Sequence, residues 1–444
     1  MKNRVIVLAM LIMLAITNVC RPESSNGVAE ENTELRRRVQ KLEQEVQELK
    51  TQLNDPEQTS SEDKEQDAEE KKLVWSNLEI QLYGHIKADA SYDNSRTTPG
   101  NYVLWVDSEA TNNDDDEFNL TANETRLGMR IRGPEEGVIQ TSGRIEFDFY
   151  GNYAAENKAK IQMRHAYLQM NWPDKLFSVL AGQTSDVFSP LAPSTLNYTV
   201  LWDAGNIGYR RPQIRLTKNF PLDTNAEIKL QGAVARTIGT TSALTGSESG
   251  EDAGFPSIQG RAGLTFPWLN DKPTKIGLSG HWGEEEYDIA SSGANKKFHS
   301  WSINLDVEQP INCWLTIKGE LFTGKNLNTY FGGIGQGVRP IKDANGITIN
   351  HNNEIDSKGG WITATIRSNK KWRFNFGLGI DDVDSGDVNM GDRILNRCVF
   401  GNAVYPITKN AEIGMELSHW QTEYKGLGDA DDMRAQLSLI YNFK

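Results

Sequence analysis

The feature that most constrains this chain is a series of short segments, from about residue 79 onward, in which polar and apolar residues alternate. Between Leu82 and Asp89, leucine, isoleucine and alanine fall on one face, whereas His85, Lys87 and Asp89 fall on the other. Successive side chains of a strand point to opposite faces of its sheet. Each segment is therefore predicted to be a β-strand with one apolar and one polar face.

About 16 such segments occur, an even number that is typical of up-and-down outer-membrane barrels. Their connections alternate between short and long. The short ones are GPEEG after Arg132, PDK after Trp172 and SNKK after Arg367, and the long ones span 93–122, 185–206, 238–256, 284–297 and 323–358. Outer-membrane barrels have short periplasmic turns and longer outside loops, so the alternation favours a membrane barrel over a soluble sandwich.

Hydropathy agrees with a membrane barrel and excludes a helical membrane protein. The mean hydropathy is -0.55 and charged residues make up 24% of the chain. Beyond the N-terminus no apolar run approaches the roughly 20 residues that a spanning helix needs, whereas a barrel strand needs only alternate apolar residues. Strands in lipid must close on themselves to pair their backbone groups. The expected fold is all-β: an antiparallel transmembrane β-barrel of about 16 strands over residues 78–444, with a water-filled lumen.

The N-terminus has the layout of a secretory signal peptide, assigned to residues 1–24. Lys2 and Arg4 precede an apolar run from Val5 to Val19, and this order of charge and hydrophobicity is typical of export signals. Cys20 suggests a lipoprotein, but Val19 stands where a lipoprotein signal has a small residue. The expected location is the outer membrane of a Gram-negative-type bacterium, in contact with its lipid.

Residues 28–54 are predicted to form a periplasmic coiled coil, followed by an acidic linker over 55–77 that is too polar to fold alone. The apolar a and d positions of its heptads are Leu35, Val39, Leu42, Val46, Leu49 and Leu53. Valine at a with leucine at d favours two strands. In contrast, the stretch from Arg38 to Glu43 is similar to a pattern of short trimeric coiled coils, and we favour a homotrimer because of the barrel.

Several strings in the front half of the barrel, in this order, resemble the DcaP-like porins. They are LYGHIKAD (82–89), TRLG (125–128), IEFDFYG (145–151), RHAY (164–167), AGQT (181–184) and RRPQIR (210–215). The resemblance implies a trimeric outer-membrane porin with a periplasmic helical segment and an arginine-lined lumen that favours negatively charged solutes. One departure is that Lys444 follows Phe443, where this class of barrel usually ends in an aromatic residue.

Strand parity places a set of arginines on the polar, lumen-facing side of the wall. They are Arg126, Arg130, Arg144, Arg211, Arg215, Arg261, Arg373 and Arg434, with Glu146 and Asp148 on the same face. Arg164 joins them only through the family resemblance, because the parity of its strand is ambiguous. Guanidinium groups stay charged and fit carboxylates, so we expect a passive diffusion channel for small anionic solutes such as carboxylates.

The arginines have an alternative role. In it they pair with Glu146, Asp148, Glu227 and Asp381 across the wall and make the barrel rigid.

The third long loop, from Asp186 to Asn206, is expected to fold inward and narrow the channel. In the alternative it is a surface cap that packs against a trimer neighbour.

The sequence offers no catalytic, metal or cofactor site. The six histidines lack a metal-ligand spacing, and the glycine-rich stretch 332–337 lacks the Lys-Ser/Thr of a phosphate loop. The net charge of -13 argues against nucleic acid as a partner. Rival functions are an exported β-sandwich that binds or hydrolyses polysaccharide, with the predicted loop Glu284–Glu286 as its nearest carboxylates, and a structural barrel that tethers the envelope.

Overall fold

The computed structural model describes residues 73–75, 77–112, 115–134, 137–151, 158–240, 248–289, 294–346, 348–368 and 371–443. The predicted signal peptide (1–24) and the coiled coil with Leu35, Val39, Leu42, Val46, Leu49 and Leu53 lie outside the described residues, as does most of the linker. The strands belong to one compact unit, Lys72–Lys444.

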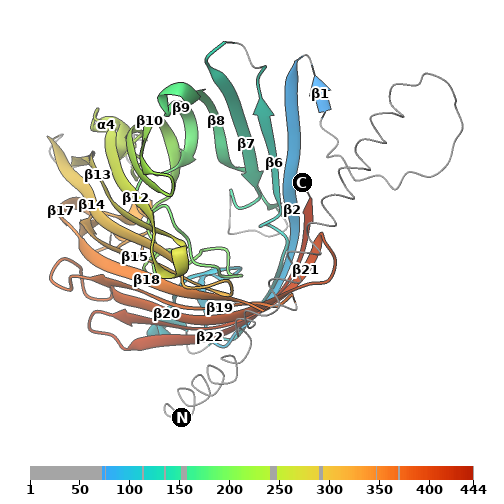
Figure 1. Ribbon diagram of the computed structural model, residues 1–444. Coiled ribbons are helices and arrows are strands. Elements are labelled where there is room, and N and C mark those ends of the chain that lie inside the picture. The colour runs from blue at the N-terminus through green and yellow to red at the C-terminus, as the bar shows by residue number, and fades with distance from the viewer. Residues whose placement is uncertain are drawn as a thin grey trace, which may run out of the picture. The chain divides into compact units, whose positions relative to one another are not determined.

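The strands form one closed antiparallel sheet in which each strand pairs with its neighbours in the chain (Figure 1). The ring closes because β2 pairs with β22, from Gly84 opposite Phe443 to Asp93 opposite Arg434. The wall strands are β2 (Leu78–Asp93), β6 (Arg126–Arg132), β7 (Gln140–Asp148), β8 (Gln162–Trp172), β9 (Phe177–Ser185), β10 (Arg210–Asp223), β11 (Ala226–Ala235), β12 (Ser257–Pro267), β13 (Pro273–Ile289), β14 (Ala294–Pro310), β15 (Leu315–Lys325), β18 (Asp356–Arg367), β19 (Arg373–Val383), β20 (Arg393–Pro406), β21 (Ala411–Tyr424) and β22 (Asp429–Phe443).

The predicted number of strands is confirmed, although the sheet contains 18 strand segments in the described part of the chain. One of them, β1 (Leu73–Trp75), extends the sheet at the start of β2. Two others, β5 (Glu117–Thr121) and β6, pair with successive parts of β2 and together make one wall strand. The described residues therefore form a closed barrel of 16 strands.

The remaining elements lie in the connections. They are the hairpins β3 (Thr97–Pro99) with β4 (Val103–Val106) and β16 (Val338–Lys342) with β17 (Thr348–Glu354), the short helices α3 (Glu109–Asn112) and α4 (Ser249–Asp252), and the 3-10 turns η2 (Pro173–Lys175), η3 (Leu269–Asp271) and η4 (Asn328–Tyr330). No helix among the described residues is long and apolar enough to span a membrane.

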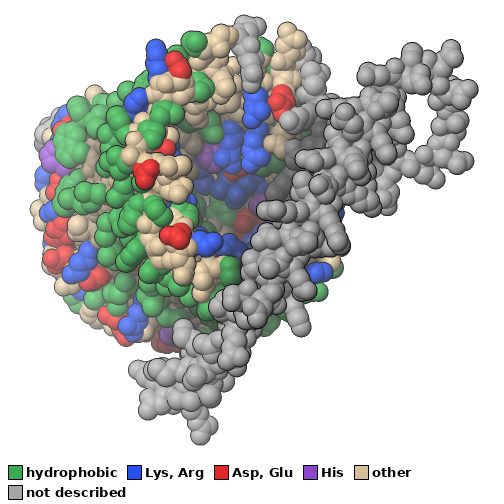
Figure 2. Space-filling view, viewed as in Figure 1, with side chains coloured by type: hydrophobic (Ala, Val, Ile, Leu, Met, Phe, Trp, Pro, Cys, Tyr) green, Lys and Arg blue, Asp and Glu red, His purple; other side chains and the backbone are tan. Residues whose placement is uncertain are grey.

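The two faces of the wall differ as the alternation predicts. On β2, Leu82 and Ile86 are each 55% exposed, whereas Lys87 and Asp89 are buried on the inner face. The same division holds on the last strand, where Leu439 is exposed and Ser438 is buried. Figure 2 shows hydrophobic side chains over the outer surface and basic side chains within the opening. The apolar outside suits lipid and the polar inside suits water.

The connections alternate in length, with one correction. The prediction of a loop over 284–297 is wrong. There β13 and β14 pair with each other, from Glu284 opposite His299 to Ile289 opposite Ala294. The acidic residues 284–286 belong to β13. The middle one, Glu285, is fully buried there because it accepts hydrogen bonds from Ser249, Tyr287 and Asn326. Glu284 and Glu286 therefore do not form a paired-carboxylate cleft with Glu285.

The third long connection, residues 186–209, folds into the barrel as expected and lies inside the ring in Figure 1. Its apolar side chains Phe188, Leu201 and Ile207 are almost fully buried. Phe188 stacks on His281 of β13, with ring centroids 4.8 Å apart. The contact joins the loop to a wall strand far along the chain, so we name residues 186–209 the constriction loop.

The position of the outer face in lipid is testable with Leu278→Arg. Leu278 is the sixth of the 17 residues of β13 and is 59% exposed. An arginine facing lipid near the bilayer midplane is expected to lower the free energy of unfolding by about 2–4 kcal/mol. The measurement is denaturant unfolding of the barrel in lipid vesicles.

The matched control is Thr323→Arg, at the loop end of the outward face of β15, where the expected loss is only about 0–1 kcal/mol. Equal losses for the two variants would contradict the assignment of this face to lipid.

Candidate functional site

Three of the predicted lining arginines are held by ion pairs, two of them within the wall and one to the first residue of the constriction loop. The pairs are Arg211 with Asp186 at 2.8 Å, Arg261 with Asp306 at 2.6 Å and Arg434 with Asp93 at 2.8 Å. Arg211 and Arg434 are almost fully buried. A buried pair that loses one partner leaves an uncompensated charge. These arginines therefore have a structural role like that of the alternative, but their partners are Asp186, Asp306 and Asp93 and not the carboxylates that it named.

A second group surrounds Glu146 on β7. Arg126, Arg144 and Arg164 lie 3.6, 2.5 and 2.8 Å from its carboxylate, and Arg164 also reaches Asp148 at 2.7 Å. Glu146 and Asp148 are both buried. Three cations thus share two carboxylates, and the neighbouring Lys87 is paired with two more, Asp89 and Glu124, so the charges of this cluster nearly balance.

A bulge explains why the parity of β8 was ambiguous. The pairing of β7 with β8 shifts between Glu146 and Phe147. A bulge places two residues of one strand opposite one residue of the other. As a result the neighbours Arg164 and His165 both approach Glu146, at 2.8 and 3.8 Å.

The other predicted arginines have weaker contacts on the inner face. Arg130 lies 4.2 Å above the ring of Tyr83. Arg215 donates to Gln213 at 3.0 Å, and Arg373, 40% exposed, is 3.4 Å from Glu412. Across the described ranges, Glu227 and Asp381 pair with no arginine, so that part of the alternative is wrong.

Arg210, the first residue of β10, was not among the predicted lining residues. Its side chain is buried, with 7% exposure, and its guanidinium carbon lies 4.4 Å from the ring of Tyr209 and 5.7 Å from that of Trp202. Among the described residues, neither its Nε nor its Nη2 has a hydrogen-bond acceptor, and no carboxylate lies within ion-pair distance. Arg210, Arg126 and Arg164 line one cavity of about 360 Å³ beside the constriction loop.

Strand parity could not find Arg210, because parity assigns one of two adjacent residues to each face. At the junction of the constriction loop with β10, both Arg210 and Arg211 are buried. The signal available was the pair of adjacent arginines directly after an aromatic residue, Tyr209.

Two buried wall carboxylates hold the constriction loop by its backbone. Glu320 of β15 accepts the N–H of Leu191 at 2.8 Å. Glu416 of β21 accepts the N–H groups of Leu196 and Asn197 at 2.6 and 3.1 Å. Hydrogen bonds of this kind are each worth about 0.5–1.5 kcal/mol. The loop is therefore fixed against the wall opposite its own strands.

Two further segments fold inward that the sequence analysis did not predict. In the first connection, Val103 and Val106 pack with Leu201 and Trp420. In residues 326–337, Gly335 donates its N–H to Asp203 of the constriction loop at 2.8 Å. Burial raises the pKa of the Asp203 carboxyl to about 7. The constriction is thus built from three segments.

Glycine allows two of these close approaches. Gly205 has a φ of 112°, and a Cβ there would meet the backbone oxygen of Gly360 at 2.2 Å. Gly333 and Gly335, both with positive φ, form the turn that presents N–H groups to Asp203 and Asp381. The glycine-rich stretch 332–337 therefore serves the constriction.

A family model described as DcaP outer membrane protein matches residues 20–235. The resemblance to the DcaP-like porins is confirmed. The outer membrane channel DcaP of Acinetobacter baumannii is similar in structure, with a TM-score of 0.67 and 20% identity, covering 83% of this chain and 99% of that chain. The front half of the chain thus matches an outer-membrane protein family, and the described strands have the fold of an outer-membrane channel.

Two other solved structures share the fold of the DcaP-like barrel. An anion-selective porin from Comamonas acidovorans has a TM-score of 0.51 and 14% identity, over 82% of this chain and 100% of that one. OmpT of Vibrio cholerae, in its trimer form, has a TM-score of 0.50 and 9% identity, over 83% and 100%. No curated protein gave a significant match.

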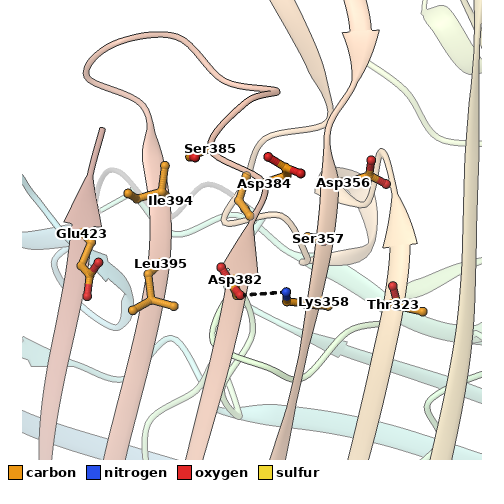
Figure 3. A pocket seen from close by; sticks show the side chains of 11 residues that line it. Thr323, Asp356, Ser357, Lys358, Asp382, Asp384, Ser385, Ile394, Leu395 and Glu423 are labelled. Atoms are coloured by element: carbon orange, nitrogen blue, oxygen red, sulfur yellow. Dashed lines mark ion pairs between the residues drawn. The ribbon is translucent and has the colours of Figure 1, made fainter. Parts of the chain in front are cut away.

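A larger cavity, of about 650 Å³, lies at the loop ends of β15 and β18–β20 in the DcaP-like barrel (Figure 3). Its lysine, Lys358, is 3.4 Å from Asp382. Asp356, Asp384 and Glu423 also line it. Its charges are mostly acidic, so size alone does not identify the site for an anion.

The structural role of the first group of arginines is testable with Arg434→Ala. Asp93 would remain buried without its cation, at an expected cost of about 3–5 kcal/mol in the free energy of unfolding. Arg373→Ala is the control, because its half-exposed pair is worth about 0–1 kcal/mol. Denaturant unfolding of both variants decides, and similar losses would contradict this division.

The anchoring of the constriction loop is testable with Glu416→Ala. The variant removes the acceptor of two loop N–H groups, so we expect a more mobile loop and a higher single-channel conductance in planar bilayers. Glu423→Ala is the control. Glu423 lines the cavity of about 650 Å³ at the loop ends of the strands, so this variant should conduct as the unmodified protein does. An unchanged conductance for Glu416→Ala would show that the loop is held by its other contacts.

Proposed function

We propose that this DcaP-like barrel is a passive diffusion channel of the outer membrane that prefers small anions, such as carboxylates. The observation that carries the proposal is Arg210, a buried guanidinium beside the constriction loop with no carboxylate within ion-pair distance among the described residues. The anion-selective porin that shares this fold is consistent with the preference.

A buried cation without a partner is costly, because its hydration is lost and nothing replaces it. Arg210 is stabilised in part by the faces of Tyr209 and Trp202, since aromatic rings attract cations. Its Nε and Nη2 still need an acceptor. An anion in the cavity supplies one.

The strength of this contact suits transport. Two unit charges about 4 Å apart interact by about 1 kcal/mol in water and by about 4 kcal/mol at an effective dielectric near 20. Binding in this range admits an anion and still releases it, which conduction requires. Arg126 and Arg164 line the same cavity but share Glu146, so their attraction for a passing anion is weaker.

A homotrimer with a periplasmic coiled coil remains a prediction. OmpT, which shares the fold, has been solved as a trimer. Three barrels tied by a coiled coil would gain effective concentration for their weaker barrel contacts.

The proposed anion preference is testable with Arg210→Gln. Reversal potentials are measured under a potassium chloride gradient in planar bilayers. Loss of an interaction worth about 1 kcal/mol or more is expected to lower the chloride-to-potassium permeability ratio by about fivefold or more.

Arg397→Gln is the matched control, because Arg397 is exposed and donates to Gln421 on its neighbouring strand. The control should keep the original ratio. A cation preference in the unmodified protein would exclude the proposed function, and an unchanged ratio in Arg210→Gln would exclude Arg210 as its source.

A further inference from the structure

A second cavity, of about 450 Å³, lies on the other wall of the lumen. Ser194, Thr195 and Leu196 of the constriction loop form one side of it, and inward residues of β14, β15 and β18–β20 form the other. It extends to Arg367 and Arg373, which flank the short turn between β18 and β19. The cavity therefore opens toward the end of the barrel that carries the short turns.

Two cations face this cavity without a carboxylate partner. Lys318 of β15 donates to the carbonyl of Ala192 at 3.2 Å. Arg367 is exposed at the end of β18. Throughout the described ranges, no carboxylate oxygen lies within ion-pair distance of either side chain. The inward arginine of β12 differs, because Arg261 is neutralised by Asp306 at 2.6 Å.

The surrounding charges leave a local positive excess. Arg373 is 3.4 Å from Glu412, and Glu308 is 3.1 Å from Lys275. Each of these carboxylates is therefore matched by its own cation. Glu320, the next inward residue of β15 after Lys318, is bonded instead to the N–H of Leu191 and the indole of Trp361. Lys318 and Arg367 are additional, and their fields add in the cavity.

The floor of the cavity is rigid. Thr365 donates to Asn375 at 2.8 Å, Asn375 donates to Asn402 at 2.7 Å, and Asn402 donates to the carbonyl of Ser194 at 2.8 Å. This chain of hydrogen bonds ties three strands to the constriction loop. A fixed polar floor below two cations is preorganised for a ligand, which lowers the entropy cost of binding.

The constriction loop connects this cavity to the one at Arg210, because Thr195 lines both. The Arg210 cavity lies against the loop ends of β6, β8 and β10, and the second cavity reaches the short turns. A solute that crosses the barrel beside the loop meets one and then the other. Conduction through several weak sites is faster than through one tight site, since an anion must also leave.

We propose that the second cavity is a binding site for small carboxylate anions, held by Lys318 and Arg367 at the short-turn side of the constriction. The inference rests on the proposed function and adds to it a second site in series with Arg210. A guanidinium binds a carboxylate through paired N–H groups, and an ammonium adds a point charge.

The test uses the full-length protein in planar bilayers, with succinate as the probe. The readout is the concentration of succinate that halves the chloride current. The variant is Lys318→Gln with Arg367→Gln, and we expect its half-blocking concentration to rise about tenfold or more, which corresponds to about 1.4 kcal/mol of lost binding. The charge-conserving variant Lys318→Arg with Arg367→Lys should keep the unmodified value within about threefold.

The control is Lys358→Gln with Arg397→Gln, which removes two exposed cations outside the lumen. It should block as the unmodified protein does. Heat-dependent gel mobility confirms that each variant is a folded barrel.

Each outcome of this test either supports the second site or excludes it. If the unmodified protein prefers chloride and the variant blocks at the original concentration, the second site is wrong and the proposed function stands. If the unmodified protein shows neither an anion preference nor block by succinate, both are wrong. If the control Lys358→Gln with Arg397→Gln weakens the block by succinate as much as Lys318→Gln with Arg367→Gln does, the effect comes from overall charge. The proposed second site is then wrong.

Discussion

The structure depends on the pairing of every wall strand with two neighbours. In lipid, an unpaired backbone N–H or carbonyl costs several kcal/mol, and closure of β2 on β22 removes the last free edge. Closure also forces the alternation of the side chains, because each strand then has lipid on one face and the lumen on the other. The inward polar side chains of the described wall strands are thereby collected on one concave surface. The charged side chains on the inner face of the wall strands surround the lumen because the ring is closed.

Inside the ring, arginines have two different roles that depend on their partners. Arg211, Arg261 and Arg434 each have a carboxylate of their own: Arg261 and Arg434 join wall strands, and Arg211 joins β10 to the constriction loop. Arg210 has aromatic faces but no carboxylate within ion-pair distance among the described residues. The difference between adjacent residues 210 and 211 shows that counting arginines on a strand face does not identify a transport site. A transport site is identified by whether each cation has a carboxylate within ion-pair distance.

Much of the fold was predictable from the sequence. The period-two pattern, the even number of strands and the alternation of turn lengths depend on local residue order, and the structure confirms them. The loop over 284–297 was predicted wrongly because Glu285 is acidic, and only the contacts with Ser249 and Asn326 explain its burial. The inner orientation of the predicted arginines followed from parity. Their partners did not, since Asp93 and Arg434 are far apart in the chain and meet only when the barrel closes.

The anchoring of the constriction loop has a consequence for how the barrel forms. The loop follows β9, early in the chain, but its N–H groups find their acceptors on Glu320 of β15 and Glu416 of β21. Until β21 has joined the sheet, the backbone of Leu196 and Asn197 has no carboxylate to bind. In a barrel whose strands pair in chain order, the lumen would therefore be wider at first. The loop would gain its last two backbone acceptors when β21 pairs, one strand before the ring closes.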